Sequence, residues 1–177
     1  MKLKLEKLRK FKTGSFAVWP FGKKMVMKGL HSRVVIIGLN PSAKIDFGEN
    51  FHKNLKFDHW YEDAFRKSPF RGAYMTDLIS KPQSKSILIL RKWENDEKFR
   101  NKNIQNLMKQ FKILGIKNTT QILCIGKKTK ELICCEPKLK LKNVWSVNHP
   151  NSYRMLDARK KFISDVNRVG RKISKTF

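Results

Sequence analysis

The stretch that decides the fold is residues 34–42, which read V-V-I-I-G-L-N-P-S. Four consecutive β-branched side chains are typical of a strand that is buried on both faces, as strands of parallel sheets are. The run reaches Gly38, and Asn40-Pro41 then opens a turn, because both residue types favour turns. The stretch therefore predicts a central parallel strand over residues 34–39 that ends in a stiff polar turn.

A second stretch of the same kind lies much later in the chain. Residues 144–153 read V-W-S-V-N-H-P-N-S-Y, again an apolar run that ends in a proline-containing turn. In an open α/β sheet, ligands bind beyond the carboxyl ends of the strands. If both runs are strands of one parallel sheet, Asn40 and His149 lie at the same edge and contribute to one site.

The rest of the chain alternates between strand and helix patterns. Further strands are predicted at 72–79, 120–125 and 143–148, and helices at 60–66, 94–114, 127–134 and 156–174. This alternation predicts an α/β fold of three layers, α/β/α, with a four-stranded, mainly parallel sheet in the middle. We expect one domain, residues 1–177.

Residues 1–14 form a basic N-terminal arm in this interpretation. Leu5, Leu8 and Phe11 can make one helical stripe within it. Two readings stay open, a solvated terminal helix and an arm that contacts DNA.

The charge balance favours a polyanionic partner. The chain has 40 Lys and Arg against 14 Asp and Glu, a formal net charge of +26. Nucleic acid is the first candidate for such a surface, although a Lys-rich coding bias can contribute to it. A hydrophobic share of 40% argues against disorder.

Cysteine usage and hydropathy set the remaining expectations. The three cysteines, two of them adjacent, make neither a disulfide framework nor a zinc-ligand pattern. We therefore expect a reducing compartment and no metal or other cofactor. No apolar run approaches the length of a membrane span, and the N-terminus has no secretory pattern. The expectation is a monomer in the cytoplasm, associated with the nucleoid if bacterial, without a membrane partner.

The two turns carry residues suited to chemistry. Gly38 allows a ligand to approach the backbone, and Asn40 can donate and accept hydrogen bonds without ionising. His149 follows a strand directly and can act as an electrophile or general acid, and Ser152 can contact a phosphate. Taken singly, each turn also has a purely structural interpretation, an Asn-Pro turn and a buried, hydrogen-bonded histidine.

Together the two turns resemble the motifs of the uracil-DNA glycosylase superfamily. The G-x-N-P motif of that family matches residues 38–41, G-L-N-P, and its H-P-S-P motif matches residues 149–152, H-P-N-S. Order, strand context and spacing agree, and the resemblance covers roughly residues 33–160. The N-P-S turn and the later Y-M-T-D-L-I segment look most like bacterial members. The resemblance implies a four-stranded parallel sheet between helices.

The resemblance also implies a role for each matching residue. Asn40 would position the water that attacks the anomeric carbon, and His149 would hydrogen-bond the 2-carbonyl of the departing base. Backbone amides after Gly38, including that of Leu39, would hold the base, and Phe47 or Phe51 would stack on it. The remaining implied contacts are to DNA: Pro41, Ser42 and Ser152 at flanking phosphates, and Tyr153, Arg154 or Met155 in the gap left by the flipped nucleotide.

Two departures from the family pattern stand out. Where the family often has an Asn that reads the pyrimidine edge, this chain has Asp77. An ionised carboxylate only accepts hydrogen bonds and would repel the 4-carbonyl of uracil. Asp77 therefore suggests either a base that shows an amino group or a structural role such as a helix cap. In addition, Asn151 and Ser152 replace the usual Ser and Pro, which alters the phosphate-binding loop.

The resemblance and the charge together lead to a functional hypothesis. It is a monofunctional DNA base glycosylase that hydrolyses the N-glycosidic bond of uracil or a related base and leaves an abasic site. Two alternatives remain open: a non-catalytic nucleic-acid-binding protein on the same fold, and an enzyme that acts on a free nucleoside or nucleotide.

Overall fold

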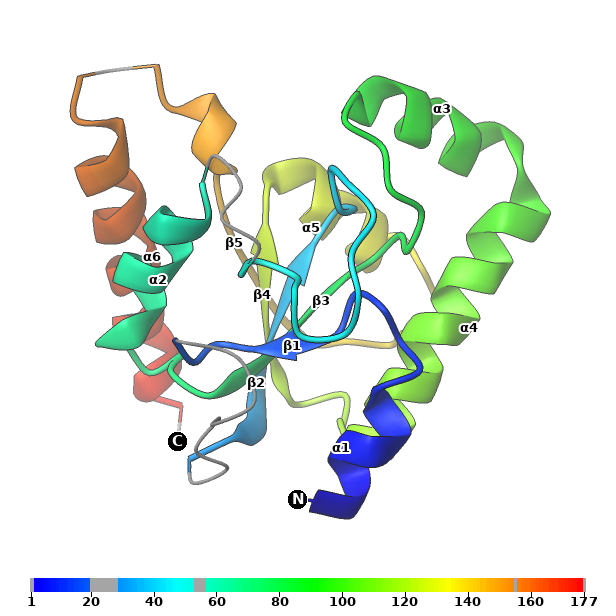
Figure 1. Ribbon diagram of the computed structural model, residues 1–177, viewed down its shortest axis with the longest axis horizontal. Coiled ribbons are helices and arrows are strands. Elements are labelled where there is room, and N and C mark those ends of the chain that lie inside the picture. Colours follow the sequence, from blue (N-terminus) through cyan, green and yellow to red (C-terminus); the bar gives the residue numbers. More distant parts are fainter. Residues whose placement is uncertain (1, 20–28, 53–56, 155, 177) are drawn as a thin grey trace.

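A five-stranded sheet forms the middle layer of the protein (Figure 1). The computed structural model describes residues 2–19, 29–52, 57–154 and 156–176. The strands are β1 (Ser15–Phe16), β2 (His31–Gly38), β3 (Ala73–Asp77), β4 (Gln121–Ile125) and β5 (Asn143–Val147). They lie in the order β1-β3-β2-β4-β5, and the strands from β2 to β5 are parallel. The predicted three-layer α/β fold with a mainly parallel sheet is confirmed.

The predicted number of strands was wrong by one. Strand β1 adds an antiparallel edge to the sheet, with Ser15 paired to Met75 and Phe16 paired to Tyr74. Two residues are too few to show the alternation by which a strand is recognised in a sequence. The strand exists because β3 offers a partner, so only the tertiary structure reveals it.

Helices cover both faces of the sheet. One face carries α1 (Lys2–Leu8), α3 (Ser86–Asn95), α4 (Glu97–Leu114) and α5 (Lys127–Cys134), and the other carries α2 (Asp58–Arg66) and α6 (Ala158–Ser174). In β2, Val35 and Ile37 pack against the first group, while Val34 and Ile36 pack against the second. All four are fully buried. The uninterrupted apolar run in the sequence reflects this two-sided burial.

The helix predicted over residues 94–114 is α4, which begins three residues later at Glu97, and the separate helix α3 before it was not predicted. Asp96 adopts an extended conformation between α3 and α4, and its side chain accepts a hydrogen bond from the backbone N–H of Phe99 at 2.8 Å. Asp96 is thus the N-cap of α4, and its local bond competes with helix continuation. The other end agrees with the sequence, since Gly115 caps α4 in the left-handed conformation with φ of 73°.

The N-terminal segment is packed on the body of the protein. Leu5 and Leu8 of α1 are buried in the core on the α4 side, and Phe11 packs against the same cluster. Thr13 continues this attachment through a hydrogen bond of 3.1 Å between its hydroxyl and that of Thr76 in β3. Among the described residues, no helix is long and apolar enough to cross a membrane.

Candidate active site

A cavity of about 710 Å³ opens at the carboxyl ends of the parallel strands. This volume lies in the range of small-molecule sites, ~300–1,000 Å³. Its wall combines the turn after β2 with the ends of β3, β4 and β5, so it joins the two stretches singled out in the sequence. The predicted site residues that line it are Gly38, Leu39, Asn40, Pro41, Ser42, Phe51, Asp77, His149 and Ser152. Phe47, Tyr153 and Arg154 are not among its lining residues.

Asn40 is held by contacts that reach across the fold. Its Nδ2 donates to the carbonyl oxygens of Pro41, at 2.9 Å, and Gln83, at 2.8 Å. The backbone N–H of Gln83 donates in turn to the Pro41 carbonyl at 2.9 Å. These bonds occupy both hydrogens of the Asn40 amide, so its remaining capacity is the acceptor Oδ1. An acceptor in this position can orient a water molecule but cannot donate a proton to a substrate.

Gly38 permits close packing at the floor of the cavity. A Cβ at this position would collide with Oδ1 of Asp77 and would come within 3.1 Å of Cζ of Phe51. The carboxyl group of Asp77 and the ring of Phe51 therefore lie directly against the backbone of β2. Any larger residue at position 38 would displace one of them.

Asp77 is the buried carboxyl group of this floor, with 5% of its surface exposed. Burial raises its pKa to about 7, although a hydrogen bond from Asn50 Nδ2 to Oδ2, at 3.0 Å, acts in the opposite direction. Asn50 is itself fixed because the same Nδ2 donates to the Thr13 carbonyl at 2.7 Å. The sequence argument treated Asp77 as ionised, whereas its surroundings favour the protonated form up to about neutral pH.

The helix cap suggested as one structural role for Asp77 is not formed. Strand β3 ends at Asp77, and the next helix, α3, begins only at Ser86. Both the bond to Asn50 and the contact with Gly38 instead tie the carboxyl group to the cavity wall.

His149 is held by a local contact. Its Nδ1 accepts a hydrogen bond of 3.1 Å from the backbone N–H of Asn151, in the short 3-10 helix η1 (Pro150–Ser152). Burial lowers the pKa of His149 below its ordinary value, so the ring is neutral at neutral pH. Because Nδ1 is an acceptor, the proton of the neutral ring is on Nε2. His149 therefore offers one uncharged N–H donor.

Of the two aromatic residues considered for stacking, the structure brings only Phe51 to the cavity. Phe51 has a left-handed backbone, with φ of 62°, and its ring meets Tyr61 edge to face with centroids 4.9 Å apart. Phe47 packs beneath this wall, where its ring fills the space beside Gly14. The sequence could not separate the two because both follow the same turn.

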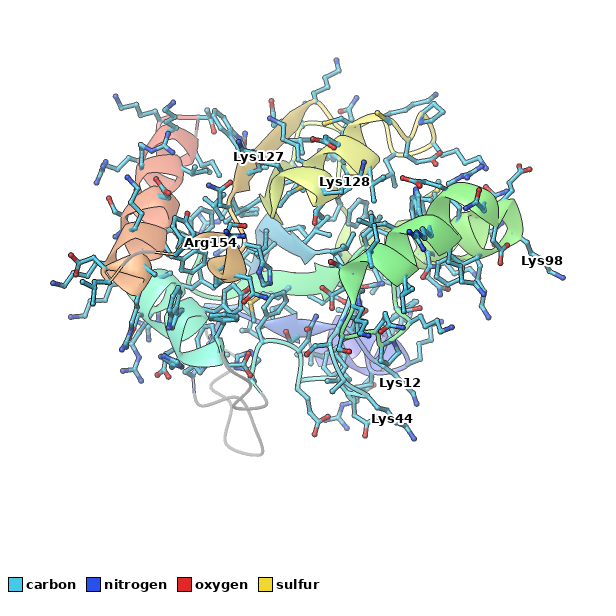
Figure 2. All side chains as sticks on the ribbon, turned by 90° about the horizontal axis from the view of Figure 1, so that it is seen from above. Lys12, Lys44, Lys98, Lys127, Lys128 and Arg154 are labelled. Atoms are coloured by element: carbon cyan, nitrogen blue, oxygen red, sulfur yellow. The ribbon has the colours of Figure 1, made fainter. Side chains whose placement is uncertain are left out.

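The loop after η1 differs from what its sequence suggested. The hydroxyl of Tyr153 donates to Asp165 of α6 at 2.7 Å, and its ring packs near Phe162. Arg154 is exposed, as Figure 2 shows, and Met155 lies outside the described residues. The sequence reading missed Leu156, whose side chain is fully exposed. An apolar residue between Arg154 and Asp157 in a polar loop was the available signal.

Sequence reasoning also missed much of the rim. Gln83, Ser84 and Ser86 line the cavity from the segment that precedes α3. Lys127 and Lys128 line it from the first turn of α5, after Gly126 with φ of 101° (Figure 2). The rim is basic here, whereas the interior holds carboxyl groups such as Asp77. Within the part of the chain that the structure describes, no group of three His, Cys, Asp or Glu could hold a metal ion.

The fold and the cavity define the class of protein. A mainly parallel α/β sheet places an amide acceptor and a neutral imidazole donor at the ends of two of its strands. The chain matches the model of the uracil DNA glycosylase superfamily over residues 27–169, and it belongs to that superfamily. No curated protein matches it.

Proposed function

We propose that this protein is a DNA base glycosylase that hydrolyses the N-glycosidic bond of uracil or a related modified or deaminated base. The observation that carries the proposal is the pairing of Asn40 and His149 in one cavity. Asn40 keeps only an acceptor there, and His149 keeps one neutral donor. Hydrolysis of this bond needs both: an acceptor for the attacking water and a donor for the departing base.

In this mechanism Oδ1 of Asn40 accepts a hydrogen bond from a water molecule and directs its oxygen at the anomeric carbon. The C–N bond breaks, and its electron pair leaves with the base. Nε2–H of His149 donates to the 2-carbonyl oxygen as negative charge develops there. A donor aimed at such charge is worth about 2.7–4 kcal/mol. The water oxygen forms the new bond to the anomeric carbon, and its proton passes to solvent or to the departed base, which neutralises the charge of the base. No metal or cofactor enters the reaction.

The cavity floor would select the base. Phe51 offers a face for stacking, and Asp77 reaches the base edge beside Gly38. When Asp77 carries a proton, Oδ2 accepts from Asn50, so the proton lies on Oδ1, where it can donate to a base carbonyl. A neutral Asp77 thus supplies the donor that uracil requires, which removes the conflict that an ionised Asp77 would create.

The distribution of charge around the cavity fits a nucleotide whose base is inside and whose phosphates are outside. The acidic side chains of Glu49 and Asp58 also line the cavity and disfavour a phosphate there, whereas a neutral base is accepted. The phosphates would stay at the rim, near Lys127, Lys128 and the hydroxyls of Ser42 and Ser152. Arg154 and the exposed Leu156 lie in the loop that would enter the space left by the flipped nucleotide.

The test is base release from a panel of labelled oligonucleotides. Uracil, hypoxanthine, xanthine, 5-hydroxymethyluracil and unmodified cytosine would each be offered in single- and double-stranded DNA, with abasic sites revealed by alkali. Asn40→Ala and His149→Ala should each reduce the rate of release by about 10²-fold or more, while Lys98→Ala, on the surface of α4, should leave it unchanged. Release that survives both cavity variants would overturn the assignment of the site.

A non-catalytic nucleic-acid-binding protein is the second candidate. The altered second motif, with Asn151 and Ser152, favours it. Salt-sensitive binding without release of any base from the panel would support this candidate over the enzyme.

A further inference from the structure

Helix α3 begins at the rim of the cavity and is held there firmly. Ser84 and Ser86 line the cavity, and Gln83 just before them is tied to Asn40 and Pro41 by the bonds described above. At the other end of this segment, the backbone N–H of Ser80 donates to Oδ1 of the buried Asn103 at 2.9 Å. The first turn of α3 therefore has a defined position beside the cavity mouth.

The two faces of α3 differ in a way that the core does not require. Ile89 and Trp93 point into the core and are almost fully buried. Ile87 and Leu88 lie on the other side of the first turn, with 55% and 45% of their surfaces exposed. Arg91 follows Ile87 by one helical turn and is also exposed. The outer face is thus apolar beside the cavity and basic one turn farther away.

The first turn of α3, which carries this exposed pair, lies across the cavity from η1, the short helix that precedes Leu156 in the chain. In Figure 1 the first turn of α3 and the loop between η1 and α6 both rise above the carboxyl ends of the strands, on either side of the cavity. Exposed apolar side chains gain stability when a partner covers them. Nucleic acid is a partner with apolar base faces and a negative backbone, and aliphatic side chains insert between bases in known modes of binding.

We propose that the outer face of α3 is a second contact surface for DNA, in which Ile87 and Leu88 pack against a base next to the extruded nucleotide. Arg91 lies toward the neighbouring phosphates. The proposal rests on the proposed function for the identity of the substrate. It means that the protein holds the strand on both sides of the cavity, through Leu156 on one side and through α3 on the other.

Charge favours this occupant over a second copy of the chain. Lys81 and Lys85 precede the exposed pair in the chain and Arg91 follows it, and all three are themselves exposed. In a symmetric contact between two copies the same surface faces itself, so these cations would be brought against one another. A polyanion meets the same surface with favourable charge.

The experiment compares Ile87→Ser/Leu88→Ser with Met108→Ser by fluorescence anisotropy at several salt concentrations. Met108 is the matched control, because it is an exposed apolar residue of α4 outside the cavity lining. The probe is a labelled duplex with one tetrahydrofuran abasic site, which has no base to release. The double variant should bind roughly tenfold more weakly, as expected for losing one base contact. Its salt dependence should stay unchanged, because no charge is removed.

Leu88→Phe is a second control at the same position. It keeps an apolar side chain there and should therefore keep the affinity for DNA. Equal affinities for the double variant and Met108→Ser would overturn the proposal. So would unchanged DNA binding combined with loss of self-association in sedimentation velocity, which would assign the surface to a second copy. Binding to the abasic probe can be measured even if the protein releases no base. Failure of the proposed function and failure of this proposal are therefore distinguishable.

Discussion

The two turns that flank the cavity hold their functional side chains in different ways. His149 is held by Asn151, two residues farther along the same turn. Asn40 is held by Gln83, which lies 43 residues away and belongs to the segment before α3. A local contact survives wherever the short motif folds, whereas a long-range contact depends on the correct docking of another segment. Replacing each side chain should therefore have different consequences for stability, even where the consequences for catalysis are similar.

The largest expected effect comes from Asn40→Ala. Base release should fall by about 10²–10⁴, because the water loses its acceptor. The free energy of unfolding should fall by about 1–3 kcal/mol as well, because the Gln83 carbonyl loses its bond from Asn40 and the Pro41 carbonyl keeps only the bond from the Gln83 N–H. Single-turnover kinetics and urea denaturation measure the two effects. A variant that loses activity with full stability would show that the bond to Gln83 does not matter for the fold.

Asn40→Asp sharpens this prediction. The carboxylate keeps an acceptor for the water but faces the carbonyl oxygens of Pro41 and Gln83 without a donor. We expect reduced stability together with base release well above that of Asn40→Ala, measured by the same kinetics and denaturation. Release no higher than that of Asn40→Ala would contradict the water-orienting role of Asn40.

His149→Ala should reduce base release by about 10²–10³, the typical cost of removing one donor to developing negative charge. Its free energy of unfolding should fall by about 1 kcal/mol, because the hydrogen bond to the Asn151 N–H is lost together with the edge-to-face contact between the His149 ring and Phe57, whose centroids lie 6.0 Å apart. Single-turnover kinetics and urea denaturation again measure the two effects. A loss of stability as large as that of Asn40→Ala would contradict the difference between the two turns.

Asp77→Asn should change base release less than Asn40→Ala and His149→Ala do, and its effects on release and on stability should depend on pH. The pKa of Asp77 is raised to about 7 in the folded protein, from 3.8. The folded state then binds more protons than the unfolded state across this interval, so the contribution of Asp77 to stability falls as pH rises through it. Asp77→Asn should be more stable than the wild type by a few kcal/mol at about pH 8, and by much less at about pH 5.

The pH dependence of stability in the wild type alone does not isolate the contribution of Asp77. The pKa values of His52, at about 4, and His149 are both lowered, so their contributions rise with pH in part of the same range. Subtracting the Asp77→Asn curve from that of the wild type cancels them. Release of uracil should likewise decline above about pH 7 in the wild type but not in Asp77→Asn, whose amide keeps a donor at every pH. Parallel pH profiles would show that Asp77 does not read the base.

The smallest expected effect comes from Lys127→Ala/Lys128→Ala at the rim. Each phosphate contact that is lost should reduce the slope of log K against log salt concentration by about 1 and weaken binding severalfold. Lys98→Ala at the start of α4 is the matched control, because Lys98 lies far from the cavity (Figure 2). Equal slopes in both variants would place the phosphate path elsewhere.

Much of the fold was predictable because its signals are short-range. The run of residues 34–37 indicated a strand buried on both faces, and the structure confirms it. The helix at 127–134 was predicted with its observed bounds. Strand β1 and helix α3 were not predicted. The strand depends on a distant partner. The helix was missed because its apolar residues do not follow one face, since Ile87 and Leu88 are exposed while Ile89 and Trp93 are buried.

By itself, the sequence determined the strand-end turns, the basic character and the local setting of His149, because periodicity, charge and contacts within a few residues are properties of the chain alone. Tertiary structure decided that Phe51 rather than Phe47 lines the cavity and that Asn40 keeps only its acceptor. It also decided that Asp77 is largely protonated below neutral pH and that one face of α3 stays exposed. Burial, hydrogen-bond saturation and pKa depend on all the neighbours of a group, and most of those neighbours come from distant parts of the chain.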